Sequence, residues 1–266
     1  MIPALLLAVV VTGCTKGESS QTATISVEQR SAAIEAAMVY LDNGKFIEAL
    51  AIMKSLIAKV PQSAEAQESY ALVLLAYAGD LEKDAQLQQA AIARNQALAA
   101  YESACANTSK PELLLLSTAQ LAHMLGEESI AKQYYERAHE ESPEDSRASF
   151  FLAQMNMLNK QWEGAKIWIE QSLSRDATEP FALLSSALIE AELGNLEEAM
   201  NRATKGCSIR PNDFNLRLLQ ARVLRIAKRP RHALEILAAL PEPLRSSNIA
   251  NEERKLCALL LEENTQ

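Results

Sequence analysis

Apolar residues recur at every third or fourth position over most of the chain, which is the spacing that places them on one face of an α-helix. The segment from Ile34 to Pro61 shows this pattern twice, with Gly44 between the two apolar stretches. Glycine adopts the left-handed conformation of a tight turn at little cost, and proline ends a helix because it lacks the backbone N–H. The pattern therefore predicts two helices joined by a short turn.

The same pattern repeats along the chain with a period of 34 residues. The units begin at Arg30, Ala64, Glu112, Ser146, Pro180 and Phe214. Position 8 of the unit is always alanine (Ala37, Ala71, Ala119, Ala153, Ala187 and Ala221). So is position 20, when the surplus residues of the longer second unit are left out of the count (Ala49, Ala97, Ala131, Ala165, Ala199 and Ala233). Because small side chains let two helix backbones approach closely, we expect these alanines to mark the crossing of the two helices in each unit.

The repeated unit resembles the tetratricopeptide repeat (TPR), which has small residues at these two positions, glycine in the turn and proline after the second helix. The glycines are Gly44, Gly126 and Gly194, and the prolines are Pro61, Pro143 and Pro211. The resemblance implies an all-α fold, a right-handed α-solenoid of about six TPR helix-turn-helix units over residues 30–247 (near 30–63, 64–111, 112–145, 146–179, 180–213 and 214–247). Residues 248–266 are expected to form a capping helix and tail, because repeat arrays need a polar end.

The second unit is longer than the others, since 48 residues separate Ala64 from Glu112. No Gly or Pro follows Gly79 in this stretch, so we expect one long second helix from about Lys83 to Ala106. About four extra helical turns would project roughly 20 Å beyond the neighbouring helices. A tolerated insertion at the edge of the array and a docking helix for a partner both fit this expectation.

The chain begins with an apolar stretch, Ala4 to Val11, that is much shorter than the roughly 20 residues of a membrane-spanning helix. Val11-Thr12-Gly13-Cys14 resembles the bacterial lipobox, so residues 1–13 are expected to be a lipoprotein signal peptide and Cys14 the lipid-carrying first residue of the mature chain. Residues 14–29 are polar and predict a flexible tether. An apolar N-terminal helix with an ordinary cysteine is the alternative, because no Lys or Arg precedes the apolar stretch.

Composition and charge exclude several classes of function. The net charge of -8 argues against nucleic acid as a partner, because phosphate binding needs a basic face. Cys105, Cys207 and Cys257 lack the close spacing of metal ligands and are expected to be buried apolar residues. The histidines (His123, His139 and His232) have no partner at metal-ligand spacing, and no phosphate-binding or nucleophile motif is present. We therefore expect no enzyme, no cofactor, no metal site and no small-molecule substrate.

In TPR proteins the first helix of each unit lines a concave groove, and positions 2, 5, 9 and 12 face it. The resemblance thus implies a partner-binding groove formed by Leu113, Leu116, Gln120, Phe150, Gln154, Met157, Phe181, Leu184, Leu188, Arg222 and Arg225. Such a groove, apolar in the centre and basic at one end, would suit an amphipathic helix or apolar strip with an acidic end. The alternative is that some of these apolar residues pack against one another.

The expected function is a protein–protein interaction scaffold, lipid-anchored in the bacterial cell envelope. No aspartate follows Cys14, which by the lipoprotein sorting rule indicates the periplasmic face of the outer membrane. The chain looks most like TPR lipoproteins that help type IV pilus secretins assemble, and next like those of outer-membrane protein assembly. A regulator of a cell-wall hydrolase or synthase is the alternative, and an enzyme with an unrecognised site in the groove is a third. The basic run in the last unit leaves three partners open: anionic lipid, an acidic protein and a second copy.

Overall fold

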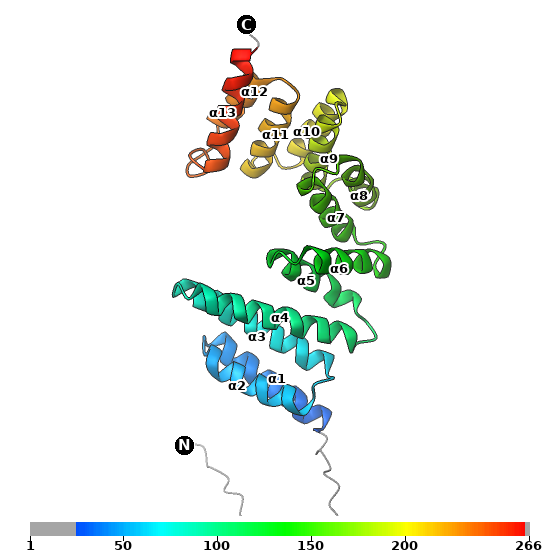
Figure 1. The fold of residues 1–266 in the computed structure, drawn as a ribbon, viewed down its shortest axis with the longest axis vertical. Helices are drawn as coiled ribbons and strands as arrows, with labels where there is room; N and C mark the ends of the chain where they lie inside the picture. Colours follow the sequence, from blue (N-terminus) through cyan, green and yellow to red (C-terminus); the bar gives the residue numbers. More distant parts are fainter. Residues whose placement is uncertain (1–24, 264–266) are drawn as a thin grey trace, which may run out of the picture. The chain divides into compact units, whose positions relative to one another are not determined.

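The fold is an array of paired α-helices, as the sequence predicts (Figure 1). A computed structural model describes residues 25–263, and within them there are 13 helices and no strand. The chain divides into unit 1, residues 1–93, and unit 2, residues 94–266. Helices that follow each other in the sequence pack against each other within each unit, so the all-α solenoid architecture is confirmed.

The first described helix of unit 1 is α1, which begins at Val27, three residues before the expected start of the repeats and inside the predicted tether. Ser26 explains this start, because its side chain accepts a hydrogen bond from the Gln29 N–H and the Gln29 side chain accepts one from the Ser26 N–H. The rest of the predicted tether, the signal peptide and Cys14 lie outside the described residues. The helices of unit 1 are α1 (Val27–Asp42), α2 (Phe46–Lys59), α3 (Ala64–Lys83) and the start of α4 (Leu87–Ala106).

Unit 2 contains the end of α4 and nine further helices. They are α5 (Glu112–Met124), α6 (Glu128–Glu141), α7 (Ser146–Leu158), α8 (Trp162–Arg175), α9 (Pro180–Glu192), α10 (Leu196–Ile209), α11 (Phe214–Ile226), α12 (Pro230–Ala238) and α13 (Asn248–Glu263). The first helices α7, α9 and α11 are capped by acidic side chains, Asp145, Glu179 and Asp213. Each of these side chains accepts backbone N–H groups that the helix cannot satisfy internally.

The twelve alanines at positions 8 and 20 are all buried, with at most 1% of each residue exposed. In unit 2, Ala187 of α9 and Ala199 of α10 belong to one core cluster, and Ala153 of α7 and Ala165 of α8 belong to another. Each pair lies where its two helices pack together. The burial of all twelve alanines is what close helix crossings at these positions require.

The long second helix predicted from about Lys83 to Ala106 is present as α4, but it begins at Leu87 and takes only part of the surplus residues, so the expected projection of about four turns is wrong. Helix α3 continues to Lys83, and the turn lies between it and Leu87, the first residue of α4. Both helices have 20 residues, against 13 and 14 in α9 and α10, so each is about two turns longer. Two whole turns keep the buried face on the same side, and Ala90 and Ala97 are accordingly both buried.

The turns between paired helices share one backbone feature, a residue with positive φ. Gly44, Gly126 and Gly194 have φ values of 70°, 78° and 85°. Ala85, Lys160 and Lys228 adopt φ values of 58°, 56° and 56° at the equivalent points of their turns. A side chain at such a φ is strained, typically by about 1 kcal/mol or more.

Replacing Lys160 by glycine is expected to stabilise unit 2 by about 0.5–1 kcal/mol, because glycine adopts this conformation without the Cβ clash. Lys160 is exposed and has no ion pair in the described part of the chain, so little else is lost. Urea unfolding followed by circular dichroism measures the change. The reciprocal variant, Gly194→Ala, should destabilise by a similar amount, and a stabilised Gly194→Ala would contradict the argument.

The closing helix α13 packs on α12 and α11, where the sequence predicts the cap. It continues the 34-residue frame: Ala250 and Cys257 are buried at the positions that Leu216 and Val223 occupy in α11. Lys255 stands at the position of the crossing alanine and is exposed. Helix α13 therefore presents a polar side chain where the other first helices meet their partner helix. No helix within residues 25–263 is both long and apolar enough to cross a membrane.

Candidate functional site

The predicted groove residues come from the first helices α5, α7, α9 and α11, all of them in unit 2. Helix α9 contacts both α7 and α11, which brings their side chains together. Six of the predicted residues are partly buried: Leu116, Phe150, Gln154, Met157, Phe181 and Arg225. Leu113, Gln120 and Arg222 are exposed, whereas Leu184 and Leu188 are buried.

A pocket of about 240 Å³ lies on α7, α9 and α11. Five predicted groove residues line it: Gln154, Met157, Phe181, Leu188 and Arg222. The three predicted residues of α5 do not reach it, and neither do Phe150, Leu184 and Arg225. The structure therefore concentrates the candidate site on the central and later repeats of unit 2.

Leu184 is the clearest departure from the predicted groove, because it is fully buried in a core cluster. Its side chain fills the space beside Gly206 of α10, where a Cβ would clash with it and would also approach the Pro180 carbonyl at 3.2 Å. Glycine at position 206 thus lets α10 lie close to α9. Leu184 holds the two helices together and leaves the pocket wall to Phe181, Ser185 and Leu188.

Further pocket residues are absent from the predicted set. Trp162 begins α8, and Leu158 and Ile226 lie at the ends of α7 and α11. Leu158, Glu192 and Ile226 share one position of the repeat, position 13, which follows the last groove position. That shared position is the signal that could have identified them. The result is a largely apolar wall with two charged groups, Glu192 from α9 and Arg222 from α11.

The profile of the tetratricopeptide repeat family matches residues 34–99 and 125–180 of the chain. The matched segments include α7 and α8, which supply part of the pocket. The protein is a tetratricopeptide repeat protein. No curated protein sequence matches this TPR chain.

Solved structures similar to the TPR chain share its fold. PilF from Pseudomonas aeruginosa is 20% identical, with a TM-score of 0.61 over 86% of this chain and 97% of PilF. A TPR protein from Parabacteroides merdae is also 20% identical, with a TM-score of 0.64 over 89% and 92% of the two chains. MamA from Desulfovibrio magneticus RS-1, residues 41 to the end, is 15% identical, with a TM-score of 0.55 over 69% and 97%. At these identities the likeness shows the fold alone. TPR proteins generally act as scaffolds for protein–protein interaction.

The predicted basic end of the TPR groove is partly neutralised within the chain, because two arginines share one carboxylate. Arg225 Nε donates a hydrogen bond of 2.6 Å to the carboxylate of Glu253 on α13, and only 17% of the Arg225 side chain is exposed. Arg222 lies 3.7 Å from the other oxygen of Glu253. Arg225 is therefore committed to the cap helix, whereas Arg222 is half-exposed and can also face a ligand.

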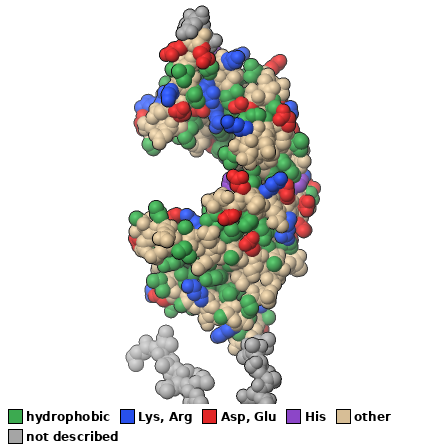
Figure 2. Space-filling view, in the orientation of Figure 1, with side chains coloured by type: hydrophobic (Ala, Val, Ile, Leu, Met, Phe, Trp, Pro, Cys, Tyr) green, Lys and Arg blue, Asp and Glu red, His purple; other side chains and the backbone are tan. Residues whose placement is uncertain are grey.

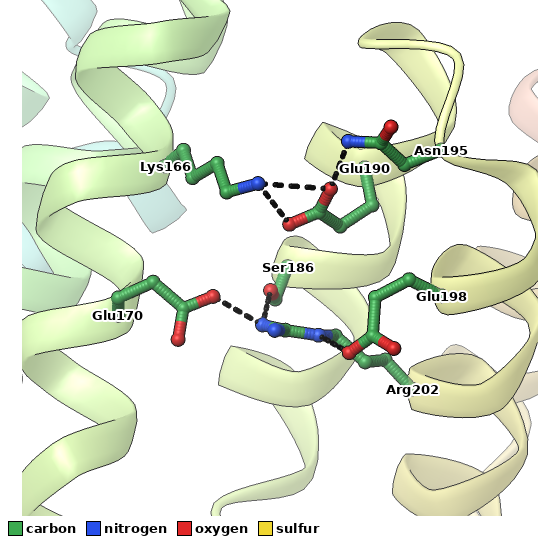
Figure 3. A network of polar contacts seen from close by, with 7 residues as sticks. All are labelled: Lys166, Glu170, Ser186, Glu190, Asn195, Glu198 and Arg202. Carbon is green, nitrogen blue, oxygen red and sulfur yellow. Dashed lines mark hydrogen bonds and ion pairs between the residues drawn. The ribbon is translucent and has the colours of Figure 1, made fainter.

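A polar network connects α8, α9 and α10 next to the TPR core (Figure 3). Glu190 of α9 is buried and lies 2.9 Å from Lys166 of α8, and Asn195 donates a 2.7 Å hydrogen bond to it. Arg202 of α10 donates hydrogen bonds to Glu170 of α8 and Ser186 of α9, and to Glu198 at 2.5 Å. The network ties three helices together and fixes the position of α9, which carries Phe181 and Leu188.

Burial and hydrogen bonding describe the surroundings of His139, Cys207 and Cys257. His139 Nδ1 and the Ser149 hydroxyl are 3.0 Å apart and hydrogen-bonded. Burial, together with the charge of Arg175, lowers the pKa of His139 against the opposing effect of Glu140. Burial raises the pKa of the Cys207 and Cys257 thiols. No three His, Cys, Asp or Glu residues between 25 and 263 come together as metal ligands would.

Proposed function

We propose that this TPR protein is an interaction scaffold of the bacterial cell envelope that binds an apolar segment of a partner protein in the pocket on α7, α9 and α11. The observation that supports this proposal is the pocket itself, in which Met157, Trp162 and Phe181 form an apolar wall open to a ligand. Its volume of about 240 Å³ is smaller than the roughly 300–1,000 Å³ of small-molecule sites, so it suits a side chain of a polypeptide.

We further propose that the chain is lipid-anchored through Cys14 on the periplasmic face of the outer membrane, and that its partner is a type IV pilus secretin or another outer-membrane complex. The sequence Val11-Thr12-Gly13-Cys14 supports the anchor. The fold shared with PilF over 97% of that protein supports a task of the same kind. The anchor and the pocket are tested separately.

The anchor is tested by expressing the chain and a Cys14→Ser variant in a diderm bacterium. We expect intact-mass analysis to show a lipid on residue 14 of the wild type, together with recovery in the outer-membrane fraction. The Cys14→Ser variant should carry no lipid and leave that fraction. A wild-type chain without lipid that still begins at Met1 would exclude the anchor.

The pocket is tested with a displayed library of random 16-residue peptides selected on the purified chain. We expect the enriched peptides to carry bulky apolar residues, and Phe181→Glu to weaken their binding by at least about tenfold, because a carboxylate would be desolvated in the apolar wall. Leu113→Glu is the matched control, since Leu113 is 77% exposed and lies outside the pocket. Equal losses in both variants, or no enriched peptide at all, would exclude the pocket as the site. Circular dichroism confirms that each variant is folded.

A further inference from the structure

The turn between α11 and α12 carries the cations Lys228, Arg229 and Arg231, with His232 beside them. We refer to Lys228, Arg229 and Arg231 as the basic turn. All three are exposed, and no acidic residue occurs from Phe214 to Leu234. In a chain of net charge -8 this is a local reversal of sign. Lys and Arg side chains lie close together over the part of unit 2 that α11, α12 and α13 form (Figure 2).

The charges of the basic turn are not used to hold the described part of the chain together. No ion pair joins any of its three residues to an acid within residues 25–263. The arginines of α11 differ, because Arg222 and Arg225 face Glu253 and Arg217 donates to the Pro211 carbonyl. Arg222 and Arg225 thus pair with the cap helix α13, whereas the three cations of the basic turn face solvent.

The basic turn adjoins the candidate pocket. Ile226 at the end of α11 lines the pocket, and Lys228 follows two residues later. Arg222, also on the pocket wall, lies one turn earlier on the same helix. A polypeptide that places an apolar side chain in the pocket and continues past α11 therefore reaches the three exposed cations.

We propose that the basic turn binds an acidic segment of the same polypeptide whose apolar side chain enters the pocket, so the ligand carries Asp or Glu next to its apolar anchor. The proposal rests on the proposed function and specifies the chemistry of its ligand. Guanidinium groups bind carboxylates through paired hydrogen bonds, which suits Arg229 and Arg231. Glu192 of α9 also lines the pocket and repels an acid placed directly beside it, so the acidic segment of the ligand is expected at the basic turn and not at α9.

A polypeptide fits these observations better than a membrane surface. The cations are continuous with a pocket that takes a side chain, whereas a bilayer would need a broad basic face. The net charge of -8 opposes a general attraction to anionic lipid. The same net charge disfavours acidic peptides in general, whereas the basic turn attracts them locally.

The test uses the peptides enriched on the full chain and the triple variant Lys228→Glu, Arg229→Glu, Arg231→Glu. We expect enriched peptides to carry acidic residues on one side of the apolar anchor, and the triple variant to bind them at least about tenfold more weakly, with a smaller dependence on salt. Peptides with Gln in place of these acids should bind the wild type weakly and lose little more in the variant. The matched control is Lys54→Glu, Lys59→Glu, Lys83→Glu, which makes the same change of charge on exposed residues of unit 1 and should leave binding within about twofold.

Three results would overturn the proposal. Enriched peptides without acidic residues, or Gln peptides that bind as tightly as acidic ones, would remove the basic turn from the site. The proposed function would still stand if Phe181→Glu abolishes the binding of these peptides. A failure of Phe181→Glu to weaken binding would instead remove the proposed function. The last result concerns vesicles. If the wild type sediments with phosphatidylglycerol vesicles but not with phosphatidylcholine vesicles, and the triple variant sediments with neither, the basic turn binds a membrane.

Discussion

Replacing Ala187 by leucine is expected to lower the free energy of unfolding of unit 2 by about 1–3 kcal/mol. Ala187 is fully buried at the crossing of α9 and α10, and Ala199 of α10 belongs to the same core cluster. The crossing leaves no space for three further carbon atoms, so the two helices must separate or Leu184 must leave its place beside Gly206. Thermal and urea unfolding, followed by circular dichroism, measure the loss.

Ala153→Leu repeats the experiment at the crossing of α7 and α8, where Ala165 is the facing alanine. The control is Ala258→Leu on α13, because Ala258 lies in a helix and is exposed. Its effect should stay within about 0.5 kcal/mol, as is usual for surface substitutions. Unchanged melting temperatures in both buried variants would mean that the helices do not cross at these alanines.

The fold could be predicted because its decisive contacts repeat with the sequence. Each pair of alanines reports a local crossing of two neighbouring helices, and that crossing uses the same two positions in every unit. The turn at Ala85 could not be predicted in the same way. Ala85 takes a φ of 58° without glycine, so nothing in the sequence marks the end of α3. The sequence pattern therefore predicts that the second helix takes all the surplus residues of the extended unit, although two helices share them.

The candidate site could be predicted only in part, because the family pattern describes first helices and ignores what packs behind them. Phe181 and Met157 line the pocket, and both stand at groove positions of the family pattern. Leu184 does not, because Gly206 of α10 leaves a space that Leu184 fills. Trp162 lies outside the predicted set because it begins a second helix.

The free charge at the basic end of the groove could not be predicted from neighbouring residues in the sequence. Arg225 lies 28 positions before Glu253 in the sequence, and only the packing of α13 on α11 brings the two charges together. Sequence order alone therefore overstates the free charge on α11. The exposed cations lie instead in the turn after it, at Lys228 and Arg229.

Replacing Lys166 by methionine is expected to destabilise unit 2 by about 1–3 kcal/mol at pH 7, since it leaves the carboxylate of Glu190 buried without its cation. The Glu190 side chain is only 2% exposed, whereas that of Lys166 is 41% exposed. Because Lys166 is partly solvated, the destabilisation should be smaller than for a fully buried ion pair. Asn195 still donates its hydrogen bond of 2.7 Å to Glu190 and offsets part of the loss. The network in Figure 3 connects three helices, so the loss acts on α8, α9 and α10 together.

The control is Lys132→Met, which breaks a 3.7 Å ion pair with Glu136 between two exposed side chains. Exposed pairs of this kind contribute little, so its effect should stay within about 0.5 kcal/mol. A loss of the same size in Lys132→Met and Lys166→Met would mean that the burial of Glu190 is not the cause.

The dependence of this loss on pH separates an ionic cause from a packing cause. Burial raises the pKa of Glu190, but the hydrogen bonds of Lys166 and Asn195 and the charges of Lys166 and Arg202 outweigh it, so the pKa lies below the ordinary value of 4.5. A carboxylate with a lowered pKa in the folded state contributes stability above the unfolded value, and this stability is lost as the pH falls through the folded value. The difference between wild type and Lys166→Met in urea unfolding should therefore be full at pH 7 and shrink as the pH falls below 4.5. A difference that is independent of pH would instead assign the loss to the packing of the Lys166 side chain.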